Sequence, residues 1–319
     1  MNYFISCDWG TSNFRLRLID TATEKVLAEI LSQQGIAATY NVWKEQQNTE
    51  RFSFYSNYIL TQVARLEEAF GNSLNDVPLV ISGMASSAIG IKDLPYKKIP
   101  IALQPQHLPV HIEAATATFP HKLILVSGVR SSNDVMRGEE TKLIGCIMNQ
   151  NQKQLFILPG THSKHIIIED ETLVDFKTYM TGELFSLLST KSILSNSVEA
   201  HDEHTEKNDS FIKGLLDASA SSLLNNIFHV RTNALFNIMN TTGNYAYLSG
   251  LLIGSELKEV SSASLKHTTL VSGDTLRPLY LSALNSLGVT GNIEIQDADE
   301  ALIKGQVLIA NKFHHFGQG

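Results

Sequence analysis

An acidic residue stands just before a glycine-threonine pair near the start of the chain. Asp8 ends the first predicted strand, and Gly10, Thr11 and Ser12 follow after one residue. The N–H groups and hydroxyls of such a turn can form a nest for an anion such as phosphate. A carboxylate beside phosphate suits Mg²⁺, which keeps several waters and takes few protein ligands. The other interpretation is that Asp8 only caps a turn, a frequent role of Asp before Gly.

A second Gly-Thr turn follows 150 positions later. Residues 8–20 (DWGTSNFRLRLID) align without gaps on residues 158–170 (LPGTHSKHIIIED), so that Gly160 and Thr161 correspond to Gly10 and Thr11. Both segments are typical of a strand, a turn and a second strand. We therefore expect one such turn in each of two lobes, binding a polyphosphate from both sides.

The densest polar cluster is SNDVMRGEETKLIG at residues 132–145. Glu139 and Glu140 fall in the first turn of a predicted helix, where the helix dipole by itself favours carboxylates. Alternatively, Glu139 accepts a proton from a substrate hydroxyl. Arg130 and Arg137 flank this helix start, and each could bind a substrate carboxylate through paired hydrogen bonds. An ion pair at the surface or between lobes is the competing role for each arginine.

Three predicted strands end in Ser-Gly, at residues 82–83, 127–128 and 272–273. Ligands in α/β folds gather beyond the carboxyl ends of strands, so these loops are expected to line a ligand site. Gly273 and Asp274 lead into a helix N-terminus, which can hold nucleotide phosphate or ribose. The simpler interpretation is a tight turn that needs glycine for its backbone.

Composition excludes several classes of protein. The 319 residues carry 25 Lys and Arg against 32 Asp and Glu, a net charge of −7 without a basic stripe, so nucleic acid is not expected as the main partner. Cys7 and Cys146 lack the spacing of a metal site or a disulfide framework. No P-loop, GxGxxG, kinase HRD–DFG, GxSxG or HExxH motif occurs. Because no signal peptide or membrane span is evident, we expect a cytoplasmic protein. The cluster HDEH at residues 201–204 and the pair at 314–315 are expected to be solvated.

Alternating strands and helices would position these residues. For the first part of the chain the pattern predicts strands at 2–7, 15–20, 25–31, 78–82 and 123–127, with helices within 50–70 and at 136–148. The pattern then restarts, with strands at 154–158, 165–169, 268–272 and 292–296 and helices at 182–194, 209–228, 243–260, 275–287 and 299–313. An exposed loop is expected at 195–209. These elements indicate an α/β protein with lobes at 1–150 and 151–298, the first completed by the helix at 299–319.

Six segments resemble the 2-dehydro-3-deoxygalactonokinase family, in the family's order and over nearly the whole chain. They are DWGTSNFR at 8–15, SGMASSAIG at 82–90, NDVMRGEETKLIG at 133–145, LPGTHSKH at 158–165, MTGELFSLL at 180–188 and SGLLIGSEL at 249–257. The resemblance implies the actin-like ATPase (sugar kinase) fold, in which two ribonuclease-H-like lobes bind ATP and substrate between them.

The resemblance also implies roles for particular residues. Asp8 to Ser12 would be the first phosphate motif with the metal ligand, Gly160-Thr161 the second, and the adenosine motif would be LVSGDT at 270–275, with Gly250 also at the nucleotide. Related carbohydrate kinases carry a catalytic Asp where this chain has Glu139, so Glu139 is the expected base, with Asp134 and Glu140 as alternatives. The expected sugar-acid contacts are Arg15, Gly83, Met84, Arg130, Asn133 and Arg137.

The implied reaction is in-line transfer of the γ-phosphoryl group of ATP, with Mg²⁺, to the terminal (6-) hydroxyl of 2-dehydro-3-deoxy-D-galactonate. Three alternatives remain: a kinase of the gluconate epimer, a phosphohydrolase of the same fold, and a sugar-sensing regulator. A homo-oligomer such as a dimer is also left open.

Overall fold

The computed structural model describes residues 3–46, 49–149, 152–200, 207–260, 267–289 and 292–314. The chain divides into two compact units. The first comprises Met1–Gln150, Glu171–Asp175 and Ala298–Gly319, and the second comprises Asn151–Asp170 and Phe176–Asp297. Relative to the lobes expected from the sequence, this division adds the short segment Glu171–Asp175 to the first unit.

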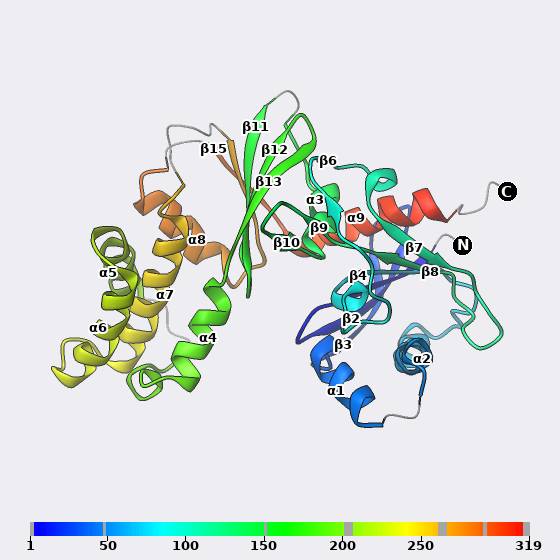
Figure 1. Ribbon diagram of the computed structural model, residues 1–319, viewed down its shortest axis with the longest axis horizontal. Coiled ribbons are helices and arrows are strands. Elements are labelled where there is room, and N and C mark those ends of the chain that lie inside the picture. The colour runs from blue at the N-terminus through cyan, green and yellow to red at the C-terminus, as the bar shows by residue number, and fades with distance from the viewer. Residues whose placement is uncertain are drawn as a thin grey trace. The chain divides into compact units, whose positions relative to one another are not determined.

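The sheet of the first unit has the strand order β3-β2-β1-β4-β8-β7 (Figure 1). The strands are β1 (Tyr3–Trp9), β2 (Phe14–Asp20), β3 (Val26–Ser32), β4 (Leu79–Gly83), β7 (Val110–Glu113) and β8 (Leu123–Val126). β1 pairs antiparallel with β2 and parallel with β4, which pairs parallel with β8. All residues of β4 and β8 are buried, the pattern of strands covered on both faces.

Helices of the first unit are α1 (Ile36–Gln46), α2 (Arg51–Phe70), α3 (Glu139–Gly145) and α9 (Ala298–Phe313). α2 begins where the Glu50 carboxylate accepts the N–H groups of Phe52 and Ser53 at 3.0 and 2.8 Å, which satisfies donors that a helix start leaves unpaired. The Trp9 ring packs on Tyr55 of α2 at 5.5 Å between centroids, so the first strand and this helix share one core. α9 returns from the far end of the chain to pack against α3 and β1.

The second unit repeats the strand topology of the first. Its sheet has the strands β11 (Lys153–Leu158), β12 (Ser163–Glu169), β13 (Thr172–Tyr179), β14 (His267–Val271) and β15 (Asn292–Gln296), in the order β13-β12-β11-β14-β15. The first residues of β13, up to Asp175, are those assigned to the first unit. β11 again pairs antiparallel with the strand that follows it and parallel with the next strand across the sheet. In both sheets the third strand pairs with the second, the second with the first, and the first with the fourth. This shared order confirms the expected α/β fold of two ribonuclease-H-like lobes.

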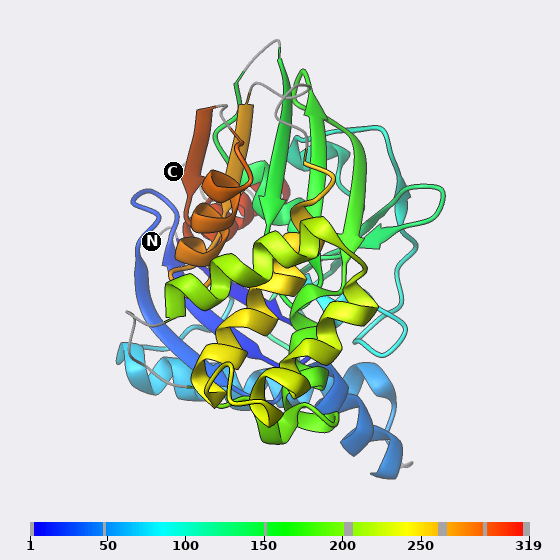
Figure 2. The same ribbon diagram turned by 90° about the vertical axis from the view of Figure 1, so that its left-hand side faces the viewer.

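In the described part of the second unit, five helices accompany the sheet: α4 (Thr181–Lys191), α5 (Lys207–Ala220), α6 (Leu223–Leu235), α7 (Thr241–Leu257) and α8 (Arg277–Ser286). α7 packs against each of the other four and is buried along most of its length, so it is the centre of this helical group (Figure 2). Among the described residues, no helix is both long and apolar enough to cross a membrane.

Several elements differ from the sequence-based expectations. The predicted helix at 209–228 is two helices, α5 and α6, and α1, β7 and β13 were not predicted. The predicted helix at 136–148 is shorter, because a hairpin of β9 (Val129–Arg130) and β10 (Val135–Met136) precedes α3. Four short strand or turn segments also occur between β4 and β7. They are a 3-10 turn at Met84–Ser86, β5 (Lys97–Lys98), β6 (Ile101–Ala102), which pairs with the start of β13, and a 3-10 turn at Pro105–His107.

The polar stretch at 195–209 is not one loop. It contains a 3-10 turn at Ser195–Ser197 and the first residues of α5. The candidate cluster at 201–204 lies outside the described residues, as does His315. The two Gly-Thr hairpins also differ in one respect: Trp9 pairs with Phe14, whereas Leu158 pairs with Lys164, so the second turn is one residue longer.

Candidate active site

The first Gly-Thr turn, between β1 and β2, is fixed by backbone hydrogen bonds. Gly10 N–H donates to Asn13 O at 2.9 Å, and Gly10 O accepts the N–H of Ile36 at 3.0 Å. Thr11 O accepts the N–H of Ala37 at 3.2 Å, so the start of α1 holds the turn from one side. Thr11 and Ser12 remain exposed. The turn therefore presents a preformed backbone and two hydroxyls to solvent.

Three backbone segments meet beside Asp8. Gly83 has φ +91°, and a Cβ there would lie 2.7 Å from Trp9 O and 3.5 Å from Asp8 Oδ1. A Cβ on Gly138, which has φ +106°, would lie 3.2 Å from Gly83 Cα. Only glycine adopts such backbone angles and tolerates so close an approach. The end of β1, the end of β4 and the start of α3 are thereby brought together, and with them the predicted residues Asp8, Gly83 and Glu139.

The two glutamates at the start of α3 have different surroundings. Glu140 is completely buried, and both of its carboxyl oxygens accept the N–H of Gly138, at 2.9 and 2.8 Å. Glu139 is partly exposed, and its Oε2 accepts the N–H of Arg137 at 3.0 Å. Because a base must reach the substrate hydroxyl, burial disfavours Glu140 in that role. Its contact with Gly138 instead holds the backbone from which Glu139 projects.

Burial and the neighbouring Glu139 charge raise the pKa of Glu140 from 4.5 to about 8. The folded protein thus keeps a proton that the unfolded chain has released between these pH values. The free energy of unfolding should therefore fall as pH rises from about 5 to 8, by up to ~1.4 kcal/mol per pH unit from this one group.

Glu140→Gln, which mimics the protonated acid, should remove this slope. We expect the variant to match wild type near pH 5 and to be the more stable protein at pH 8. Urea unfolding of both proteins at several pH values measures the difference. Parallel curves would show that Glu140 is not protonated in the folded state.

Two of the predicted sugar-acid contacts, Arg15 and Arg137, are held by other groups. Arg15 Nη1 lies 2.5 Å from Asp299 Oδ1 at the start of α9, where Arg17 also binds the same carboxylate. The buried Arg137 guanidinium donates to the Ser86 carbonyl and, at 2.6 Å, to Ser86 Oγ. The same guanidinium packs on the Tyr96 ring at 4.2 Å from its centroid. Through these contacts Arg15 and Arg137 have a structural role in the first unit.

The other predicted contacts lie near the β9–β10 hairpin or after β4. Arg130 and Asn133 are exposed, and Met84 begins a 3-10 turn directly after Gly83. The Asp134 carboxylate accepts the N–H of Val135 at 2.7 Å within the hairpin. Asp134 therefore takes part in shaping the hairpin, whereas the Arg130 side chain is available at the surface.

The second Gly-Thr turn, between β11 and β12, sits on the N-terminus of α4. Thr161 O accepts the N–H of Glu183 at 3.0 Å. A Cβ on Gly182 would lie 2.6 Å from Gly160 O, so glycine is required at this contact. Beside Gly160 itself there is open space, with no heavy atom within 4 Å of a Cβ position. A helix N-terminus joined to an open glycine turn is a favourable place for phosphate.

A pocket of about 240 Å³ within the second unit adjoins this turn. Gly160, Thr181 and Gly182, from the turn and the start of α4, are among its lining residues. The remaining lining residues come from α4, α7 and the region from Thr275 into α8, and are largely apolar: Phe185, Tyr245, Ser249, Leu252, Ile253, Thr275, Leu276, Leu279 and Tyr280. A largely apolar pocket that adjoins an open glycine turn and a helix N-terminus could take a nucleoside phosphate.

Three of the predicted nucleotide-binding residues, Gly250, Gly273 and Asp274, are not among the residues that line this pocket. Gly250 does not line it: Gly250 lies in the contact of α7 with α5, where a Cβ would be 2.1 Å from Phe211 O. Gly273 has open space around it, and the Asp274 side chain is 93% exposed and pairs with Arg277 at 3.0 Å. Both therefore lie on the loop that leads to Thr275 in the pocket wall.

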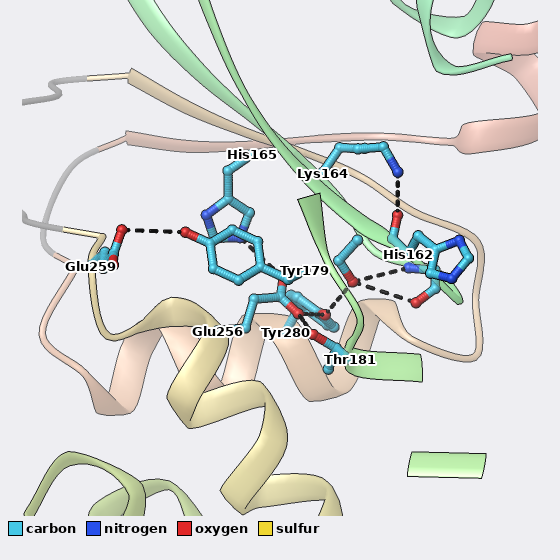
Figure 3. A network of polar contacts seen from close by, with 10 residues as sticks. His162, Lys164, His165, Tyr179, Thr181, Glu256, Glu259 and Tyr280 are labelled. Carbon is cyan, nitrogen blue, oxygen red and sulfur yellow. Dashed lines mark hydrogen bonds and ion pairs between the residues drawn. The ribbon is translucent and has the colours of Figure 1, made fainter. Parts of the chain in front are cut away.

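A buried polar network behind the turn was not predicted. Glu256 of α7 accepts hydrogen bonds from Thr181 and Tyr280, and it pairs with His165 (Figure 3). Thr181 and Glu256 lie in two of the family-like segments, MTGELFSLL and SGLLIGSEL, in which only Gly250 was expected to have a role. A single sequence does not show which residues of an apolar helix face a neighbouring pocket.

Comparisons with known proteins agree over nearly the whole chain. A family model described as 2-keto-3-deoxy-galactonokinase matches residues 8–309. The chain is 31% identical over 315 residues, 95% of both proteins, to the "Probable 2-dehydro-3-deoxygalactonokinase DgoK1" of Rhizobium meliloti (strain 1021). It is 30% identical over 218 residues to the 2-dehydro-3-deoxygalactonokinase of Escherichia coli (strain K12), covering 66% of this chain and 71% of that protein. A crystal structure of a candidate 2-dehydro-3-deoxygalactonokinase from Sinorhizobium meliloti superposes with a TM-score of 0.83 at 29% identity, covering 99% of both chains.

Proposed function

The chain belongs to the 2-keto-3-deoxy-galactonokinase family, and we propose that it transfers the γ-phosphoryl group of ATP to the terminal hydroxyl of 2-dehydro-3-deoxy-D-galactonate. The observation that carries the ATP half of this proposal is the open Gly160 turn, seated on the N-terminus of α4 and continuous with an apolar pocket. Adenosine would occupy the pocket, and the phosphates would lie toward Gly160 and Thr161.

Asp8 is our proposed ligand for Mg²⁺. Within the described part of the chain, no three His, Cys, Asp or Glu side chains are grouped to hold a metal ion by themselves. Mg²⁺ that arrives with ATP needs only one or two carboxylates, since phosphate oxygens and water complete its shell. Asp8, beside the exposed Thr11-Ser12 turn, fits that requirement. When bound, Mg²⁺ neutralises charge on the transferring phosphoryl group.

Glu139 is our proposed base for the acceptor hydroxyl. It is the partly exposed carboxylate of the pair at the start of α3, and Glu140 and Arg137 fix the backbone on either side of it. The proton of the attacking hydroxyl would pass to a Glu139 carboxylate oxygen as the new oxygen–phosphorus bond forms and the bond from the γ-phosphorus to the bridging oxygen breaks, so that ADP leaves. Arg130, exposed at the β9–β10 hairpin, is the arginine we assign to the sugar-acid carboxylate, since Arg15 and Arg137 already bind protein groups.

Release of ADP from Mg-ATP tests the function. The purified protein is assayed with 2-dehydro-3-deoxy-D-galactonate, with its gluconate epimer and without acceptor. We expect ADP to form with the galactonate compound and much more slowly with the epimer. Equal use of both epimers would contradict the specificity, and ADP formed equally without acceptor would contradict the kinase assignment in favour of a hydrolase.

A further inference from the structure

Behind the second turn lies a buried carboxylate with three hydrogen-bonding neighbours. Glu256, near the end of α7, is 2% exposed. Its Oε2 accepts the hydroxyls of Tyr280, at 2.6 Å, and of Thr181. Its Oε1 lies 3.0 Å from Nε2 of the buried His165. Glu256 thus joins α7 to β12, to the first residue of α4 and to α8 (Figure 3).

The chain of hydrogen bonds continues from Tyr280 to the turn itself. Tyr280 has one hydroxyl proton, and it donates that proton in its hydrogen bond to the Glu256 carboxylate. Ser163 is therefore the donor in its 3.0 Å contact with Tyr280. Ser163 Oγ, with its proton committed, is then an acceptor for the N–H of Gly160 at 3.3 Å. Ser163 Oγ also lies 3.4 Å from Gly160 O, a longer contact than the 3.0 Å to Tyr280. By occupying the Tyr280 proton, the carboxylate favours the shorter Ser163–Tyr280 hydrogen bond and leaves Ser163 Oγ as an acceptor for Gly160 N–H.

Tyr280 and Thr181 also belong to the pocket wall, whereas Glu256 and Ser163 do not line the pocket. The carboxylate consequently lies outside the proposed nucleotide site and acts on it through two residues that do line it. Burial, together with the Glu256 charge, raises the pKa of Tyr280 well above its ordinary value, so its hydroxyl stays a donor.

We propose that Glu256 is a positioning residue for the phosphates of the nucleotide, acting through Tyr280 and Ser163 on the Gly160 turn. This inference rests on the proposed function. The consequence is selective: loss of the relay should weaken binding of nucleotides whose phosphates contact the turn and spare adenosine, which needs only the pocket.

Tyr280→Phe is the sharpest test, because it removes the hydroxyl and keeps the ring that lines the pocket. We expect the Kd of ADP and ATP to rise about 10-fold, the factor expected for one lost hydrogen bond within a charged network. The Kd of adenosine should change less than ~2-fold. Titration calorimetry with adenosine, ADP and ATP measures all three. Glu256→Gln should shift the same ratio in the same direction.

Tyr247→Phe is the matched control. Tyr247 is also a buried tyrosine of the second unit, and its hydroxyl also donates to a carboxylate, Asp217, at 2.7 Å, but it does not line the pocket. It should lower the melting temperature as Tyr280→Phe does, with no change in the ratio of adenosine to ADP affinity.

Three results would count against the inference. Equal weakening of adenosine and ADP in Tyr280→Phe, or no weakening of either, would overturn the inference alone. A wild-type protein that binds neither ADP nor ATP would overturn the proposed function and this inference with it.

Discussion

Replacing Glu139 with Gln is expected to lower kcat at least ~100-fold while the Kd of ATP stays within a factor of about two. Glutamine has nearly the same shape and can still accept the N–H of Arg137, so the start of α3 should be preserved. What the variant loses is the ability to take a proton from the acceptor hydroxyl. Steady-state kinetics, with ATP binding measured separately, distinguish the loss of a base from the loss of a binding site.

The matched control for this variant is Asp134→Asn, because Asp134 is the other partly exposed carboxylate among the candidate bases. Because the Asp134 carboxylate accepts a hydrogen bond inside its own hairpin, an amide there should keep most of the activity. Near-normal turnover in Glu139→Gln, or a collapse of turnover in Asp134→Asn alone, would remove Glu139 from the role of base.

Gly182→Ala is expected to lower kcat/KM for ATP about 100-fold, the loss that a displacement near 1 Å can cause at a reacting group. The new Cβ would lie 2.6 Å from Gly160 O and 2.8 Å from Thr161 Cα, so the phosphate turn must move away from α4. Alanine favours helix more than glycine does, so the helix itself should not unfold. A melting temperature close to wild type, together with the kinetic loss, would identify displacement of the turn as the cause.

Ser186→Ala on the exposed side of the same helix is the control for Gly182→Ala. It makes an equally small change about one helical turn further along α4, but adds no atom against Gly160. Its kinetics should equal those of wild type. An active Gly182→Ala enzyme would show that the second turn does not need its present distance from α4.

Many of the strands, and their order along the chain, could be predicted from the sequence because buried strands consist mostly of apolar residues. LVISG and LILV are continuous apolar runs, and both form fully buried parallel strands. The single helix predicted at 209–228 was wrong because apolar residues recur on both sides of Ser221 and Ser222, where the chain turns between α5 and α6. Periodicity measures which face is buried, and it does not mark a break between two helices that bury similar faces.

The sequence offered site candidates most readily where a residue type admits few roles. Asp8 and the Gly-Thr turns were found because a turn between two adjacent strands is indicated by a few consecutive residues. The arginines could not be assigned, because Arg137 is held by Ser86, fifty-one residues away in sequence, and Arg15 by Asp299 on the last helix. Gly250 likewise could not be placed from the sequence: Phe211, which it packs against, lies on another helix. Contacts made by tertiary packing decide these roles.

The phosphorus NMR spectrum of the reaction product tests the central claim most directly. After incubation with Mg-ATP and 2-dehydro-3-deoxy-D-galactonate, the account predicts one new phosphomonoester, coupled to the protons of the terminal CH₂ group and equal in amount to the ADP formed. Inorganic phosphate as the only new signal beside ADP would contradict phosphoryl transfer to the sugar acid. A phosphate ester on another carbon would contradict the proposed acceptor hydroxyl.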